Sequence, residues 1–163
     1  MMVASSGRGG WVILLSFMLA LMLTEIPLPE VFEWGRPQWA ALVLIYWVAA
    51  LPHRVGPWYG WMVGLLLDIL QGSLLGVHAL SLALIAAIIS SLHQRFRMYP
   101  LWQQALLVMV MVGLYQQLLN WGQSLQGGRS ESLLFLLPAL VSAFIWPWVF
   151  VLLRSIRRAL SVR

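Results

Sequence analysis

The 163-residue sequence contains no cysteine and no lysine, and Asp68 is its single aspartate. The absence of cysteine excludes disulfide bridges, cysteine-ligated metal sites and a thiol nucleophile. One aspartate cannot supply the paired carboxylates that many acid–base enzymes use. Nucleophile elbows, phosphate-binding glycine loops and metal-binding helix motifs are also missing. We therefore predict that the protein is not an enzyme and holds no cofactor or metal.

Apolar residues, by contrast, make up 61% of the chain, charged residues make up 9%, and the mean hydropathy is +0.86. A soluble domain of this size could not bury so much apolar surface. We predict an all-α integral membrane protein with six transmembrane helices in one bundle, which forms a single domain over residues 1–163. The predicted spans are residues 11–28, 37–51, 57–71, 74–92, 101–123 and 133–153.

The second and third spans, 37–51 and 57–71, are short for a membrane crossing. Each has about 15 residues, or roughly 22 Å of helix, against roughly 30 Å of hydrocarbon. Either both cross as short helices, or they form one re-entrant hairpin. We prefer two crossings, because a hairpin would place His53 and Arg54 deep in the bilayer. Aromatic residues are then expected at the membrane interfaces: Trp39, Trp47, Trp58, Tyr59 and Trp61.

The arginines predict the orientation of the chain. In a six-span arrangement Arg36 and Arg129 lie on one side, and the other eight of the ten basic residues share the opposite side. These eight are Arg8, Arg54, Arg95, Arg97, Arg154, Arg157, Arg158 and Arg163. The positive-inside rule then places both termini in the cytoplasm. We expect this basic surface to meet anionic lipid rather than nucleic acid, since the arginines flank apolar runs.

Asp68 lies inside apolar sequence, near the expected end of the third span. A charge at mid-membrane costs roughly 2.5–3.5 kcal/mol, so the carboxylate needs a partner, water or a place near the headgroups. Gly72 is expected to end the helix in the left-handed conformation. Two interpretations stay open for Asp68, with His78 a further candidate in the same polar stretch. Either Asp68 accepts hydrogen bonds that fix the register of neighbouring helices, or it contributes to a partner interface or cavity.

Small residues and amides add further structural or partner-interface candidates. Gly72 and Gly76 have small-xxx-small spacing, as do Gly60 and Gly64, and we prefer packing within the bundle over packing on a partner. Gln116 and Asn120 lie one turn apart and give the outer half of the fifth span a polar stripe. In a membrane such a stripe should face protein or water.

Several motifs together resemble the bacterial rod shape-determining protein MreD family. They are Arg36-Pro37-Gln38-Trp39, Tyr46-Trp47, Leu51-Pro52-His53-Arg54, the block from Gly64 through Asp68 and Gly72-Ser73 to Gly76, Leu101-Trp102-Gln103-Gln104-Ala105, and Trp146-Pro147-Trp148 with its basic tail. The resemblance spans nearly the whole chain. It implies a fold similar to the S-components of energy-coupling-factor transporters, with a central pocket, and it supplies no catalytic residues.

The resemblance also implies a function. The protein is expected to be a non-enzymatic scaffold of the cell-elongation complex in the bacterial inner membrane, where it binds MreC and supports rod shape and peptidoglycan synthesis. Expected further partners are RodA, a class B penicillin-binding protein, and MreB directly or through MreC. The alternative is a small solute-binding subunit of a membrane transporter, which should line a cavity with several polar groups. The sequence does not indicate which surface binds MreC, in what stoichiometry, or whether a ligand is bound.

Overall fold

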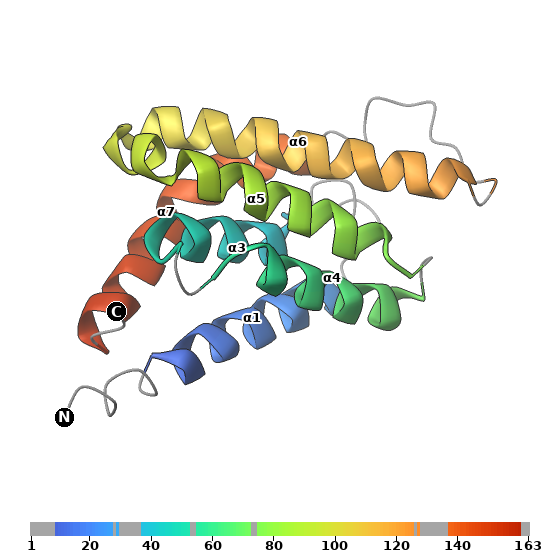
Figure 1. Ribbon diagram of the computed structural model, residues 1–163, viewed down its shortest axis with the longest axis horizontal. Helices are drawn as coiled ribbons and strands as arrows, with labels where there is room; N and C mark the ends of the chain where they lie inside the picture. The colour runs from blue at the N-terminus through green and yellow to red at the C-terminus, as the bar shows by residue number, and fades with distance from the viewer. Residues whose placement is uncertain are drawn as a thin grey trace.

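The computed structural model describes residues 9–27, 29, 37–52, 55–72, 75–125, 127 and 137–160 (Figure 1). This part of the chain forms helices without strands: α1 (Gly10–Glu25), α3 (Trp39–Ala50), α4 (Pro57–Gln71), α5 (Val77–Met98), α6 (Leu101–Leu125) and α7 (Leu137–Ala159). Helices α5, α6 and α7 are long and apolar enough to cross a membrane, whereas α1 and α3 are apolar but shorter. The predicted all-α fold is confirmed for the described residues, and three of its helices have the length and composition of membrane spans. Six crossings stay a prediction.

Contacts between helix ends show that α3, α5 and α7 run in one direction, so that α4 and α6, which lie between them in the chain, run in the opposite direction. The Gln38 N–H, just before α3, donates to Ser142 Oγ near the start of α7 at 3.0 Å. At the other end of α3, Arg97 Nη2 of α5 donates to the Ala50 carbonyl oxygen at 3.2 Å. Figure 1 accordingly shows the start of α1 and the end of α7 at one end of the bundle. Six crossings would require this alternation.

The two ends of the bundle carry different charges, and we name them accordingly. The arginine end contains the C-terminal ends of α3, α5 and α7 and the start of α6. The aspartate end contains the C-terminal ends of α1 and α4 and the start of α5, with Asp68 in the last turn of α4. Gln71 Nε2 and Glu25 Oε1 meet there at 3.4 Å, which brings the ends of α4 and α1 together.

Helix α3 is the centre of the bundle. Eleven of its twelve residues are buried, because α5, α1 and α7 pack around it. Helix α4 packs mainly on α5 and hardly touches α3. The segments predicted to form either two short crossings or one re-entrant hairpin are two helices that each pack on α5, and their crossing of the membrane stays a prediction. Helix α3, with 12 residues, spans only about 18 Å.

The prediction that the tryptophans form an interfacial belt is wrong for Trp47. Trp58 is 77% exposed, and Trp39, Tyr59 and Trp61 are partly buried, but Trp47 is fully buried. Its indole Nε1–H donates to Ser16 Oγ of α1 at 2.8 Å. An indole can enter the core when its polar N–H has a partner there, and Ser16 supplies that partner. Trp47 therefore joins α3 to α1 instead of marking a membrane surface.

Two helices extend well beyond the predicted spans, and α6 ends two residues past its predicted end, at Leu125. Helix α5 continues past its predicted end at residue 92 as far as Met98, and α7 continues past its predicted end at residue 153 as far as Ala159. Arginines in a last helical turn interact favourably with the helix dipole, and their long side chains reach the headgroups while the backbone stays helical. Helix α5 also starts later than predicted, at Val77, since Gly76 has a left-handed φ of 103°.

Candidate functional site

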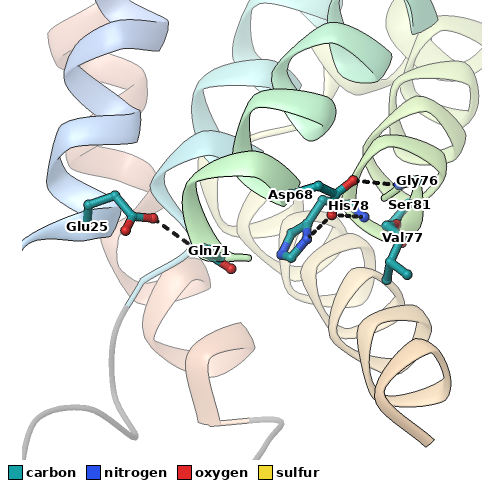
Figure 2. A network of polar contacts seen from close by, with 7 residues as sticks. All are labelled: Glu25, Asp68, Gln71, Gly76, Val77, His78 and Ser81. Atoms are coloured by element: carbon teal, nitrogen blue, oxygen red, sulfur yellow. Dashed lines mark hydrogen bonds and ion pairs between the residues drawn. The ribbon is translucent and has the colours of Figure 1, made fainter. Parts of the chain in front are cut away.

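Asp68 lies in the last turn of α4, and the residue is 1% exposed. Pro57 occupies the first turn of this helix, where its missing N–H costs nothing. Gly72 ends the helix with a left-handed φ of 63°, as expected from the sequence. The chain turns there and returns as α5, so the carboxylate of Asp68 lies beside the first turn of the following helix (Figure 2).

The Asp68 carboxylate caps the N-terminus of α5. Oδ2 accepts a hydrogen bond from the Gly76 N–H at 2.8 Å, and Oδ1 accepts one from the His78 N–H at 3.1 Å. The ring Nδ1 of His78 lies 2.7 Å from the same Oδ1. An N-terminal N–H group usually bonds to the side chain of its own capping residue. Gly76 has no such side chain, so the preceding helix supplies the acceptor.

His78 connects this cap to a third helix. The side chain is buried, and its ring packs edge-on against Tyr115 of α6 with the ring centroids 6.1 Å apart. Negative charge at a helix N-terminus is favourable, which lowers the cost of burying the carboxylate. Asp68 and His78 together therefore join α4, α5 and α6. These are contacts of the kind that the structural interpretation of Asp68 requires, and both of its predicted roles stay predictions.

The two glycine pairs differ, and the predicted close packing at Gly72 and Gly76 is wrong. Both glycines lie in the turn, where a Cβ atom would meet nothing within 4 Å. Gly60 and Gly64 of α4, by contrast, lie against the backbone of α5. A Cβ at Gly60 would lie 2.7 Å from the Leu82 carbonyl oxygen, and one at Gly64 would overlap the backbone of Ala79. Only this pair lets two helices approach closely.

Gln116 and Asn120 stay apart from the Asp68–His78 cluster. Both side chains are partly buried in α6. Gln116 Nε2 and Asn120 Oδ1 are buried atoms with no hydrogen-bond partner among the described residues. Such atoms are costly inside a protein. The predicted polar stripe thus exists, with an amide donor and an amide acceptor one turn apart.

The described arginines gather at the arginine end. Arg95 and Arg97 are in the last turn of α5, and Arg154, Arg157 and Arg158 are in the last turns of α7. Arg54 lies outside the described residues, as do Arg8, Arg36, Arg129 and Arg163.

Three of these arginines line a cavity of about 210 Å³ between α3, α5, α6 and α7. Arg97, Arg154 and Arg157 share it with Tyr46 and Gln104. Sequence reasoning did not place Tyr46 or Gln104 at a site, although both occur in the motifs that resemble MreD. Trp146, from a third motif, donates its indole N–H to Gln104 Oε1 at 3.3 Å. Residues more than 40 positions apart thus meet at this end of the bundle.

A second cavity is an apolar groove of about 400 Å³ between α1, α3 and α7. We call it the α1–α7 groove; its lining includes Leu15 and Leu19 of α1 and Val149, Leu152 and Ile156 of α7. The polar hydroxyl of Ser16 in its wall is engaged, since it donates to the Ile13 carbonyl oxygen and accepts from Trp47. Among the described residues, no group of three or more His, Asp or Glu side chains could hold a metal ion.

The chain is similar to known proteins over nearly its whole length. The model of the family described as rod shape-determining protein MreD matches residues 6–156. A protein of Haemophilus influenzae named rod shape-determining protein MreD is 37% identical over 153 residues, which cover 93% of this chain and 94% of that protein. No solved structure matches. The predicted likeness to the S-components of energy-coupling-factor transporters therefore stays a prediction.

Proposed function

Because the chain belongs to the MreD family of rod shape-determining proteins, we propose that it is a non-enzymatic scaffold of the cell-elongation complex. It lies in the bacterial inner membrane with the arginine end and both termini in the cytoplasm. There it binds MreC and supports rod shape and peptidoglycan synthesis. RodA, a class B penicillin-binding protein and MreB join the same complex, MreB directly or through MreC.

The α1–α7 groove is the observation that carries the scaffold proposal. Helix α1 packs mainly on α3 and leaves the space between α1 and α7 open. Leu15, Leu19 and Leu152 are 52%, 58% and 60% exposed there. Lipid tails are as apolar as leucine, so a groove of this kind favours a helix over lipid through close packing rather than through hydrophobicity. An apolar segment of MreC is the occupant that we propose.

The aspartate end supports this role by holding the scaffold in one shape. Asp68 ties the start of α5 to the end of α4, and Gly60 and Gly64 bring the two helices together along their length. Helix α5 also packs on α3, which lines one side of the groove. A surface that recognises a partner is most effective when its supporting elements are rigid.

Recovery of partners from native membranes tests the proposal. MreC should co-purify with the tagged chain, whereas an ATPase of a transporter should co-purify if the protein is a solute-binding subunit. Leu152→Trp fills the α1–α7 groove and should reduce the recovery of MreC. Leu80→Trp is the matched control, because Leu80 is 63% exposed on α5 and outside the groove.

Equal recovery of MreC with both variants would exclude the groove as its binding surface. Recovery of a transporter ATPase without MreC would overturn the scaffold role itself.

A further inference from the structure

The cavity at the arginine end contains hydrogen-bond donors that the protein does not use. Arg97, Arg154 and Arg157 line one space of about 210 Å³, and Arg97 and Arg154 are exposed. A cavity can hold a water molecule from about 10–15 Å³ upwards, so this one has room for a larger group. Its walls include Phe150, over whose ring the Arg154 Cζ atom lies at 6.0 Å.

Within the described residues these guanidinium groups have few acceptors. To the described part of the protein they make one hydrogen bond, from Arg97 to the Ala50 carbonyl oxygen. Among the described residues none of these arginines pairs with a carboxylate, and the ion pair between His78 and Asp68 lies at the opposite end of the bundle. Like charges that share a cavity repel one another, and an anion between them offsets this repulsion.

The other polar side chains of the cavity also favour an anion. Gln104 is already engaged: its Nε2 donates to the Phe96 and Tyr99 carbonyl oxygens, and its Oε1 accepts from Trp146. Tyr46 is 3% exposed, and its buried hydroxyl has no hydrogen-bond partner among the described residues. A buried hydroxyl without a partner is uncommon and points to a missing acceptor. The hydrogen-bonding groups of the cavity that are still without a partner are therefore almost entirely donors, and most of them carry positive charge.

We propose that this cavity binds a phosphate group, with Arg97, Arg154 and Arg157 pairing with its oxygens and the Tyr46 hydroxyl donating to it. Guanidinium forks match phosphate oxygens with two parallel hydrogen bonds, which a lysine cannot do. An anionic lipid headgroup or a soluble phosphorylated solute can supply the phosphate. The assignment rests on this geometry and does not depend on the scaffold role.

Two binding experiments on the purified full-length chain distinguish the sources. Native mass spectrometry measures retention of dioleoylphosphatidylglycerol, with dioleoylglycerol, which lacks the phosphate, as the control lipid. Calorimetric titration measures binding of inorganic phosphate. Retention of the phospholipid alone assigns the site to a headgroup, whereas binding of inorganic phosphate assigns it to the phosphate group in either setting. If neither the phospholipid nor inorganic phosphate binds, the proposal is overturned.

Variants then locate the site. Arg97→Gln and Arg154→Gln should each weaken binding about tenfold, since each removes charge-assisted hydrogen bonds. Tyr46→Phe keeps the ring contacts with Trp47 and Phe150 and should weaken binding by a smaller factor. The matched control is Arg95→Gln, since Arg95 is exposed in the same last turn of α5 but does not line the cavity.

Unchanged binding in Arg95→Gln, with unchanged helicity and size-exclusion behaviour in all variants, supports the site. Equal losses in Arg95→Gln and Arg97→Gln would mean that the surface charge of this end attracts anions without a defined site.

Discussion

The aspartate end and the arginine end, at opposite ends of α5, hold their charges in opposite ways. At the aspartate end one buried carboxylate accepts two backbone N–H groups and contacts the His78 ring. At the arginine end three arginines line one cavity and make one hydrogen bond to the other described residues. Arg97 follows His78 by 19 positions in α5, which places these sites about 28 Å apart along the helix. The separation is close to the hydrocarbon thickness of a bilayer.

The difference indicates which charges serve the fold and which serve binding. A buried polar group whose partners all come from the protein stabilises one arrangement of helices and has little capacity left for a ligand. A group of donors without acceptors contributes little to the fold and is available to an anion. We therefore expect substitutions at the aspartate end to change stability and substitutions at the arginine end to change binding.

The sharpest test of the comparison asks which end faces the cytoplasm. Met98 at the arginine end and Leu125 at the end of α6 are 83% and 82% exposed, so they form a matched pair. The chain has no cysteine of its own, and each can be replaced by one. In intact spheroplasts an impermeant thiol reagent should label Leu125→Cys and leave Met98→Cys unlabelled until the cells are lysed. Labelling of Met98→Cys from outside would reverse the proposed orientation.

Loss of the Asp68 carboxylate should be the most damaging substitution for stability. Asp68→Ala leaves the Gly76 and His78 N–H groups without their acceptor, which should lower the free energy of unfolding by about 3 kcal/mol. Asp68→Asn keeps one acceptor and should be milder. Thermal unfolding in detergent measures both, and rod shape in a strain without the native copy reports function. Equal damage from Asn and Ala would indicate that ionisation itself matters, as in a proton relay.

Adding one methyl group at Gly64 should be somewhat less costly. The new Cβ overlaps the backbone of Ala79, so α4 must move away from α5, and overpacking of this kind costs about 1–3 kcal/mol. Gly113→Ala is the control, because nothing lies within 4 Å of its Cβ and alanine favours a helix over glycine by about 0.8–1 kcal/mol. Thermal unfolding should therefore move in opposite directions for the two variants. Similar shifts would show that α4 and α5 are not closely packed at Gly64.

The smallest effect on stability is expected at the arginine end. Arg154 is exposed, and it makes no hydrogen bond to another described residue. Arg154→Gln should change the free energy of unfolding by less than about 0.5 kcal/mol in phosphate-free detergent, as for most surface substitutions. Unfolding followed with and without added phosphate measures this. A large loss without phosphate would mean that the arginine has a structural role and would weaken the contrast between the two ends.

Local sequence was sufficient for several features of this protein. Hydropathy indicated a helical membrane protein, since so much apolar surface has no soluble alternative. Pro57 and Gly72 predicted both limits of α4, because the constraints that they impose on the backbone are local. Asp68 stood out because a carboxylate in apolar sequence requires partners wherever it lies. The C-terminal ends of α5 and α7, by contrast, were predicted too early, before their arginines. Charged side chains can extend to the membrane surface from a helix as well as from a turn, so arginines do not indicate where a helix ends.

Only the tertiary structure decided which residues meet. Gly60 with Gly64 and Gly72 with Gly76 have the same spacing, yet only the first pair lies against another helix. Trp47 is buried because Ser16 of α1 lies within reach of its indole. Tyr46 shares a cavity with Arg97 and Arg154 because α3 ends beside the ends of α5 and α7. Spacing along one helix specifies a face but not its neighbour, and the neighbour depends on how all the helices pack together.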